Sequence, residues 1–320
     1  MRRRRASPDV SAREQRPQVS LGLPVFNGER FLQQTLDALL AQTYADFELI
    51  IADNASTDGT EELCRAYAGR DARIRYHRSD ENRGATWNFN RAFTLCSAGY
   101  FKWSAYDDLC DPEFLEACVP ALDAAPRAVL VYPKTRLIDE NGRVVRDHED
   151  GLALLERAPH DRLRRLVCAL GYANATYGLM RSSALRRTRL LGAYPSADYV
   201  LLAELALLGE FVEVPERLFL RRIHPQMSRQ AHPSAADAAT WFRPQARSRF
   251  RAEAWRLCIE HLISISRAPL PASERLRCFL TFADVGGRRY SDHLARELWQ
   301  LTLLAVRQAR ELAGKLASSR

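Results

Sequence analysis

Acidic side chains stand at the ends of two extended segments in the first third of the chain. Asp53 follows the short buried strand predicted over 48–52, and Asp107 and Asp108 follow the extended segment 100–104. A lone carboxylate in such a place can accept hydrogen bonds from the base or ribose of a nucleotide. Adjacent carboxylates repel each other unless a cation joins them, and Mg²⁺ or Mn²⁺ is commonly held by one or two carboxylates plus substrate phosphates. The alternative for the pair is an acidic cluster at the start of the following helix.

Polar turns accompany these acids. Residues 24–28 read P-V-F-N-G, which alone predicts only a turn. Its place at the carboxyl end of the first strand favours a functional role for it. Residues 53–60 read D-N-A-S-T-D-G-T and open a helix, which Asp58 and Thr60 are suited to cap. Capping does not account for Asp53, because it lies at the end of the strand.

Strand and helix patterns alternate along the first half of the chain, with short connections. Such alternation predicts a parallel, doubly wound α/β sheet, in which ligands bind at the carboxyl ends of the strands. Pro24 is expected to end the first strand. The predicted strands cover residues 19–23, 48–52, 73–77, 100–104 and 129–132, and the predicted helices cover 29–42, 60–67, 86–96 and 112–122.

The second half departs from this alternation. Asn141-Gly142 is a strong hairpin signal, so an antiparallel excursion is expected after the α/β half. The remaining elements are predicted as a helix over 160–170, an extended segment over 173–180, a helix over 198–208, an extended segment over 211–222 interrupted at Pro215, and helices from Ala235 onward.

Composition limits the class of protein. The chain has 320 residues, a net charge of +8 and a pI of about 9.3. It contains no run near the ~20 apolar residues that span a bilayer, and none follows the basic start, so we expect a cytoplasmic protein with a disordered basic tail over residues 1–17. The seven cysteines form no C-x-x-C pair, which argues against disulfides and zinc. Nucleic-acid-binding signatures are absent from the sequence, so phosphate-bearing substrates or anionic lipids fit the charge as well.

The order of four motifs closely resembles the family 2 glycosyltransferases. These motifs are P-V-F-N-G, D-N-A-S-T-D-G-T, the N-R-G-x5-N of residues 82–90, and the D-D-L-C-D-P of residues 107–112. The resemblance covers residues 18–226. It implies a GT-A fold, with a mixed, doubly wound sheet and a Rossmann-like nucleotide-binding half. The implied division is a catalytic domain over 18–230 and a helical C-terminal region over 231–320.

The resemblance also implies a donor site. Pro24 and Phe26 would lie against the nucleotide, Asp53 would contact its base, and Arg83 or Gly84 would line the pocket. The donor would be a nucleoside-diphosphate sugar.

The metal and the catalytic base are implied in the same way. Asp107 and Asp108 match the last two acids of the family's D-x-D-D stretch, whose first acid is Ala105 here. Asp108 is expected to bind Mn²⁺ or Mg²⁺, with Asp107 on the ribose or the metal. His224 matches a histidine that closes over the diphosphate or the metal. Asp198, at the start of a later helix, matches the base, although an N-cap role is the alternative.

Arg221 and Arg222, next to His224, are expected to face an anion. Glu204, six residues after Asp198, is expected to point elsewhere. The usual Glu-Asp pair is missing at the position of the base, because Ala197 precedes Asp198.

The implied reaction is an inverting, metal-dependent transfer of a hexosyl or related sugar to an acceptor hydroxyl, in glycan, polysaccharide or glycolipid synthesis. The alternatives are a nucleotide-sugar-binding protein without strong catalysis and a nucleotidyltransferase. The lack of lysine in the first turn disfavours the nucleotidyltransferase. A dinucleotide oxidoreductase would need G-x-G-x-x-G in that turn, which is absent.

The C-terminal helices leave three alternatives open. They pack on the catalytic domain, join two copies in a homodimer, or lie peripherally on the inner face of the cytoplasmic membrane beside a lipid-linked acceptor. Trp241, Phe242, Trp255 and Trp299 among many arginines resemble an interfacial face.

Overall fold

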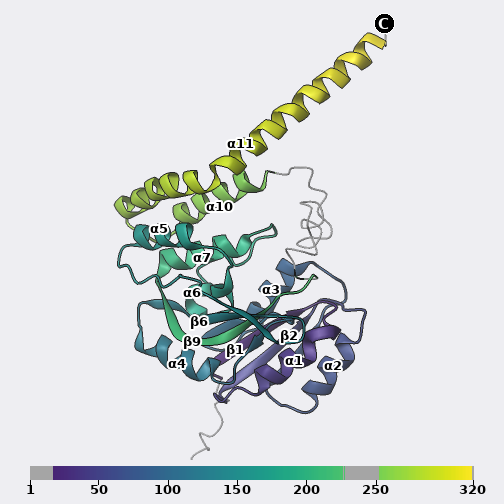
Figure 1. Cartoon of the computed structure of the whole chain (residues 1–320), viewed down its shortest axis with the longest axis vertical. Coiled ribbons are helices and arrows are strands. Elements are labelled where there is room, and N and C mark those ends of the chain that lie inside the picture. The colour runs from purple at the N-terminus through teal and green to yellow at the C-terminus, as the bar shows by residue number, and fades with distance from the viewer. Residues whose placement is uncertain (1–16, 226, 228–251, 319–320) are drawn as a thin grey trace, which may run out of the picture.

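A mixed sheet is the framework of the protein (Figure 1). The computed structural model describes residues 17–225, 227 and 252–318, with the backbone only for residues 300 and 303–318. Its strands are β1 (Val19–Val25), β2 (Phe47–Asp53), β3 (Ile74–Arg78), β4 (Tyr100–Trp103), β5 (Leu109–Cys110), β6 (Ala128–Ile138), β7 (Val144–His148), β8 (Leu179–Arg181) and β9 (Glu210–Arg222).

The helices cover the sheet and extend beyond it (Figure 1). They are α1 (Glu29–Leu40), α2 (Thr60–Ala68), α3 (Ala85–Thr94), α4 (Phe114–Ala124), α5 (Pro159–Ala169), α6 (Ser182–Leu185), α7 (Ala197–Leu208), α10 (Glu253–Arg267) and α11 (Ala272–Ser318), together with the 3-10 helix η1 (Asn174–Tyr177).

The first half of the sheet is parallel, as predicted. Its strand order is β3-β2-β1-β4, so the order reverses between β1 and β4, which is the place where such sheets bind ligands. All seven residues of β1 and of β2 are buried, because each strand lies between layers on both faces.

Pro24 does not end the first strand. It stays in β1, in register with Ala52 of β2, and β1 continues to Val25. On its other side β1 pairs with β4 only as far as Gly22. The missing N–H of Pro24 therefore removes no bond from the sheet, which explains why the strand tolerates it.

The second half of the sheet is mixed. The path continues as β4-β8-β6-β9-β5, with β8 antiparallel to both neighbours and β9 parallel to β6. The predicted hairpin at Asn141-Gly142 is confirmed as the turn between β6 and β7. Pro215 does not interrupt β9; the register against β6 shifts between Pro133 and Thr135 instead. The expected extended segment 173–180 is wrong in its first part, which forms η1.

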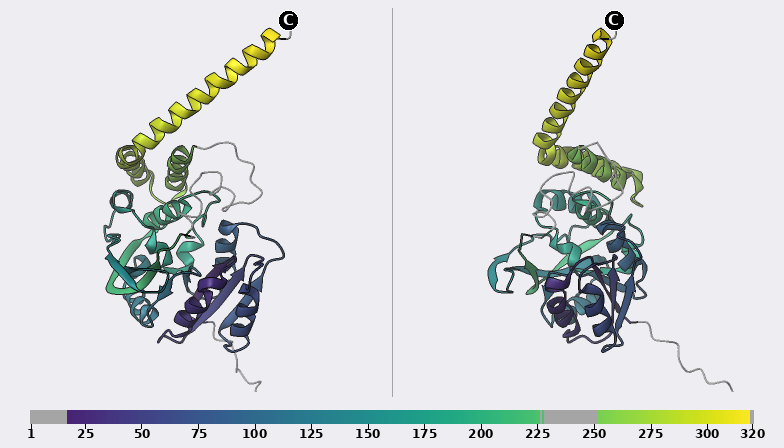
Figure 2. Two further views of the ribbon diagram at one scale, coloured as in Figure 1. Left: turned by 45° about the vertical axis from the view of Figure 1, so that its right-hand side comes forward. Right: turned by 90° about the vertical axis from the view of Figure 1, so that its right-hand side faces the viewer.

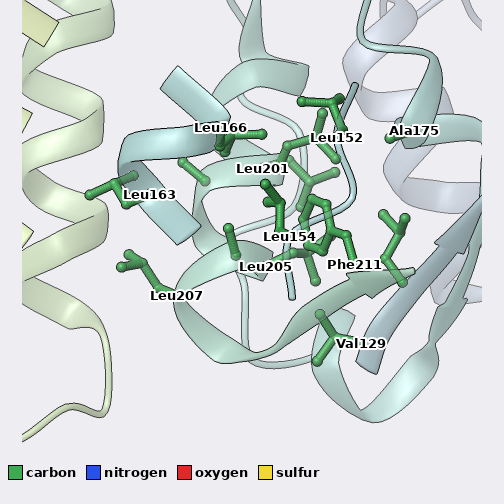
Figure 3. Packing of buried hydrophobic residues seen from close by; sticks show 14 of the residues in the cluster. Val129, Leu152, Leu154, Leu163, Leu166, Ala175, Leu201, Leu205, Leu207 and Phe211 are labelled. Carbon is green, nitrogen blue, oxygen red and sulfur yellow. The ribbon is translucent and has the colours of Figure 1, made fainter. Parts of the chain in front are cut away.

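A second layer of helices lies over one end of the sheet (Figure 2). Figure 3 shows α5, α7 and β9 contributing to one core, in which Leu166, Leu201, Leu205 and Phe211 are fully buried. Replacing such a leucine by alanine costs about 2–5 kcal/mol.

The helices α10 and α11 pack on α7 and α5, respectively, and the far end of α11 extends alone beyond the body in every view of Figures 1 and 2. No helix among the described residues is long and apolar enough to cross a bilayer. All seven cysteines are free thiols.

Parts of the predicted outline lie outside the described residues. These are nearly all of the basic tail, the boundary near residue 230, the helical start at Ala235, and Trp241 and Phe242. From Glu253 onward the expected helical region is confirmed.

Candidate active site

Three turns meet the carboxyl edge of the parallel strands. The turn after β1 is fastened to the turn after β2 by hydrogen bonds: the Asn27 N–H donates to Ser56 Oγ (3.0 Å), and the Thr57 N–H donates to Asn27 Oδ1 (2.8 Å). Asn27 has φ of 51°, a left-handed conformation that asparagine tolerates better than most residues. Phe26 beside it is 38% exposed, whereas Pro24 is buried within the strand.

Asp53 lies at the end of β2, completely buried. Its Oδ1 accepts from the Ser56 N–H (2.9 Å), and its Oδ2 accepts from the Tyr76 hydroxyl (2.7 Å). Arg78 Nε lies 3.5 Å from the same Oδ2. Because both oxygens already have partners in the protein, Asp53 fixes the shape of the turn after β2 and ties it to β3.

Arg83 and Gly84 form the turn that enters α3. Gly84 has φ of 87°, in the left-handed region that glycine alone adopts freely. Its N–H donates to Asn82 Oδ1 (2.9 Å), and the Arg83 N–H donates to Asn54 Oδ1 (3.1 Å). The Arg83 guanidinium lies over the Trp87 indole, 4.9 Å from the ring centroid, and forms an ion pair with Glu81 (3.2 Å). This turn therefore places a cation against an aromatic ring next to the turn after β2.

Asp107 and His224 meet at the end of the sheet. His224 Nε2 lies 3.0 Å from Asp107 Oδ2, and the ring of His224 packs against Phe31 of α1 with centroids 4.9 Å apart. The His224 side chain is fully buried, and its Nδ1 has no hydrogen-bond partner among the described residues. The Asp107 side chain keeps 17% of its surface exposed. Asp107 is therefore partly accessible to a ligand, with an imidazole beside it.

Asp108 points inward instead. Its Oδ1 accepts from the Arg222 N–H (2.8 Å), and the residue is 8% exposed. Burial, together with the negative charge of Asp107, raises the pKa of Asp108 to about 7, although Arg221 and the bond from the Arg222 N–H act in the opposite direction.

Arg222 holds the loop that carries both acids. The guanidinium donates to the carbonyl oxygens of Asp107 (2.8 Å) and Glu140 (2.7 Å) and to Gln34 Oε1 (2.8 Å). The residue is 1% exposed, so the expectation that Arg222 faces an anion is wrong. Its charge is taken up by carbonyl and amide oxygens inside the protein.

Tyr177 senses the charge of several acids of this region. Burial raises the pKa of its phenol, and the charges of Asp108, Asp107 and Asp198 act in the same direction, whereas Arg221 lowers it. These three acids come from the β4–β5 loop and the start of α7. Asp53 makes its contacts elsewhere, at the turns after β2 and β3.

Asp198 occupies the first turn of α7. Its Oδ1 lies 3.0 Å from the Tyr199 N–H, and the helix begins after Ser196, which has φ of 60°. The cap position belongs to Ser196, so Asp198 is not the N-cap. Glu204 points away, as expected: it accepts from Arg189 (2.5 Å) and from Ser264 (3.0 Å), which joins α7 to α10.

Residues of η1 complete the site, and the sequence patterns did not indicate them. Asn174 Oδ1 accepts from Arg221 Nη1 (2.6 Å), and its Nδ2 donates to Asp150 Oδ1 (2.9 Å). The Arg221 guanidinium also lies 4.8 Å from the centroid of the Tyr172 ring. Arg221 is thus held at the edge of the same group of acids. Asn174 lies in a segment whose pattern predicted extended chain, so the sequence carried no usable signal for it.

The residues at this edge could hold a divalent ion only if a bound diphosphate supplied further donor atoms. Within the described residues, no group of three or more His, Cys, Asp or Glu side chains could hold a metal. Asp107 and His224 supply two donor atoms, and Mg²⁺ or Mn²⁺ commonly takes one or two carboxylates and completes its shell with phosphate oxygens and water. The residues present therefore fit an ion that arrives with a diphosphate.

Comparison with known proteins places the chain in a family. The model of glycosyl transferase family 2 matches residues 20–188, more than half of the chain. An uncharacterized glycosyltransferase of Rickettsia felis is 32% identical over 133 residues, which are 41% of this chain and 21% of that protein. The chondroitin synthase of Escherichia coli is 29% identical over 129 residues, 40% of this chain and 19% of that protein. The matched region thus spans about a fifth of these relatives.

Solved structures share the fold. S. aureus TarS 1–349 in complex with UDP superposes with a TM-score of 0.62 at 14% identity, covering 86% of this chain and 72% of that one. The mannosyltransferase PcManGT of Pyrobaculum calidifontis, in complex with GDP-Man and Mn²⁺, gives a TM-score of 0.52 at 16% identity, covering 93% and 81%. The predicted GT-A fold is confirmed, and the chain belongs to glycosyl transferase family 2.

Proposed function

We propose that the protein transfers a hexosyl or related sugar from a nucleoside-diphosphate sugar to an acceptor hydroxyl, with inversion at the anomeric carbon. The observation that carries the proposal is the contact of His224 with Asp107 (3.0 Å) next to the buried Asp108, in a region where the charges of Asp107, Asp108 and Asp198 all act on the Tyr177 phenol. A pair of metal ligands and a separate carboxylate are the groups that such a transfer needs.

The donor's nucleotide would lie on the turns after β1 and β2. Phe26 offers an exposed ring, and Arg83 and Gly84 border the same edge. Asp53 would act mainly by holding its turn in shape, because its oxygens are engaged by Ser56 and Tyr76. Two structural neighbours carry donors of this class, UDP-GlcNAc in TarS and GDP-Man in PcManGT.

The metal ligands we propose are Asp107 and His224. Asp108 was expected to bind the ion directly, but its burial and its bond to the Arg222 N–H favour a supporting role. A bound Mn²⁺ or Mg²⁺ would neutralise the charge that develops on the departing diphosphate. The protein's own part is to hold the Asp107 carboxylate and the His224 imidazole at one point, through Arg222 and Phe31.

The base we propose is Asp198. Its carboxylate would accept the proton of the acceptor hydroxyl as the oxygen attacks the anomeric carbon from the face opposite the diphosphate, and this single displacement inverts the configuration. Its place in the first turn of α7 suits a carboxylate, because a helix N-terminus favours negative charge.

The setting we propose is synthesis of a polysaccharide, another glycan or a glycolipid in the cytoplasm, with a glycan or lipid-linked acceptor. The catalytic domain would cover residues 18–230, and the helical region 231–320 would be an accessory to it. A second candidate is donor binding with weak catalysis, which the replacement of the first family acid by Ala105 favours.

One experiment separates these candidates. The protein is screened by thermal shift against UDP-, GDP-, ADP- and dTDP-sugars with and without Mn²⁺, and the donor that raises the melting temperature is then incubated with the protein while sugar release is followed. Release of an inverted sugar, seen by NMR of the anomeric proton, supports the proposal. Binding without turnover supports the second candidate, and a retained configuration contradicts inversion.

A further inference from the structure

Exposed apolar side chains gather on α10 and α11. Contiguous exposed apolar surface marks an interaction site, whereas scattered single residues are normal on a soluble protein. Most of the large apolar side chains that the described part of the chain exposes lie on these two helices, namely Trp255, Ile259, Leu262, Ile263, Leu276, Leu280, Leu298 and Trp299.

On α11 these side chains form one stripe. Residues spaced by four, three and four positions share one side of a helix. The side of α11 that contacts the body carries Glu274, bonded to His160, and Arg289, bonded to the Val167 carbonyl. The opposite side carries what we call the outer stripe, which consists of Leu276, Leu280, Ala283 and Gly287, all exposed.

A matching stripe runs along α10. Trp255, Ile259 and Leu262 share one side, and Glu260 contacts Arg189 on the side that faces α7. The two helices pack against each other through His261 and Phe282, whose rings stack at 4.9 Å. The exposed apolar surface is therefore two helices wide and faces away from the catalytic domain.

We propose that a second copy of this chain packs on the outer stripe, with the two α11 helices antiparallel about a two-fold axis. The stripe has two large residues followed by two small ones. A two-fold axis between Leu280 and Ala283 places Leu280 against the partner's Ala283 and Leu276 against the partner's Gly287. Each large side chain then meets a small one, which is the self-complementarity that a symmetric dimer requires. In a single copy the space above Gly287 is open, because a Cβ added at Gly287 meets nothing within 4 Å. We call this open space the hollow.

The charges on α10 and α11 favour a protein partner over a lipid surface. Arg277 is 65% exposed, and Asp284, which pairs with Arg164 and Arg288 in its own chain, is still 47% exposed; both lie on one flank of the outer stripe. The antiparallel arrangement brings Arg277 near the partner's Asp284, so opposite charges meet on both sides of the axis. A surface that binds anionic lipid needs an excess of positive charge. Between residues 253 and 299 the chain has seven arginines, no lysine and six acidic residues, so a second copy is favoured over a membrane.

The test is the oligomeric state of the full chain, measured by light scattering and sedimentation over a range of concentrations. We expect a dimer whose dissociation constant rises about tenfold or more in Leu280→Glu. Gly287→Leu is the sharper variant, because the single copy has room for the side chain and a helix gains from losing glycine, whereas the dimer loses its hollow. The Gly287→Leu protein should be monomeric, while its circular dichroism spectrum and melting temperature remain those of a folded protein.

The matched control is Val145→Glu, which changes an exposed apolar residue on β7 and should leave the dimer intact. A monomeric wild-type protein overturns the proposal. So does a Gly287→Leu variant that dimerises as tightly as the wild type. Monomeric protein that floats with phosphatidylglycerol vesicles, and loses this in Leu280→Glu, also overturns it in favour of a membrane.

Discussion

His224 Nε2 lies 3.0 Å from Asp107 Oδ2, although the two residues are 117 positions apart in the chain. The contact joins the two halves of the sheet at the site, because Asp107 follows β4 and His224 follows β9. The site therefore requires both halves of the sheet, the parallel half and the mixed half.

Removing the ligands at this contact should abolish the response to metal. With a nucleoside diphosphate present, Mn²⁺ should raise the melting temperature of the wild type but not of Asp107→Asn or His224→Gln, because the ion loses one of its two protein ligands. Calorimetric titration gives the affinity. Asp46→Asn, an exposed acid far along the chain, is the control. A response that survives in Asp107→Asn but disappears in Asp108→Asn would reverse the assignment of the two acids.

Asp198→Asn should lower turnover by about 10²- to 10⁴-fold, the usual contribution of a general base. Donor affinity should stay close to that of the wild type, because the proposed role involves the acceptor hydroxyl. Steady-state kinetics and calorimetry measure the two quantities on the same preparation. Glu204→Gln is the informative comparison, because Glu204 belongs to the same helix but bonds Arg189 and Ser264; it should cost stability rather than chemistry. Wild-type turnover in Asp198→Asn would rule out Asp198 as the general base.

Arg222→Met should destabilise the protein and impair donor binding together. The carbonyl oxygens of Asp107 and Glu140 would lose their donor, at about 1–3 kcal/mol for each buried group left without a partner. Thermal unfolding and donor titration measure the two effects. Arg136→Met, which breaks an exposed ion pair with Asp147, should change stability by less than about 1 kcal/mol. Unchanged donor affinity in Arg222→Met would show that the loop keeps its shape without the guanidinium.

The packing of α10 on α11 should weaken in acid because of His261. Burial lowers its pKa to about 4, with the charges of Arg189 and Arg289 acting in the same direction. The unfolded chain binds this proton at about pH 6.5, so the free energy of unfolding falls as the pH drops from about 6.5 to about 4. The loss reaches about 3 kcal/mol at the lower limit.

The measurement is thermal unfolding of the wild type and His261→Phe between pH 4.5 and 7.5. Phenylalanine keeps a ring against Phe282 and cannot take up the proton. The difference between the two curves isolates His261 from the carboxylates that titrate in both proteins. Parallel curves over this range would mean that His261 titrates alike in the folded and unfolded states.

Sequence patterns predicted the edge of the sheet well, for a physical reason. Parallel strands place their carboxyl ends together, so the turns after β1, β2 and β4 had to meet once the alternation was recognised. Helix starts such as that of α7 followed from apolar spacing. The place of His224 came from the family resemblance alone, because no local pattern relates it to Asp107.

Contacts made through tertiary packing escaped prediction. Asn174 and Tyr177 lie in a 3-10 helix inside a segment whose pattern favours an extended chain. Arg222 was expected to face an anion, yet carbonyl oxygens from two loops accept its hydrogen bonds inside the protein. Pro24 stayed within its strand because of where the neighbouring strand stops, which no property of β1 itself could indicate.

The Arg222 guanidinium connects the hairpin between β6 and β7 to the acidic loop. Arg222 bonds the Glu140 carbonyl at the tip of that hairpin and the Asp107 carbonyl in the acidic loop with the same planar group. The two loops are thus mechanically linked across more than thirty intervening positions. We therefore expect an insertion or deletion at this surface turn to shift the loop that carries Asp107 and Asp108.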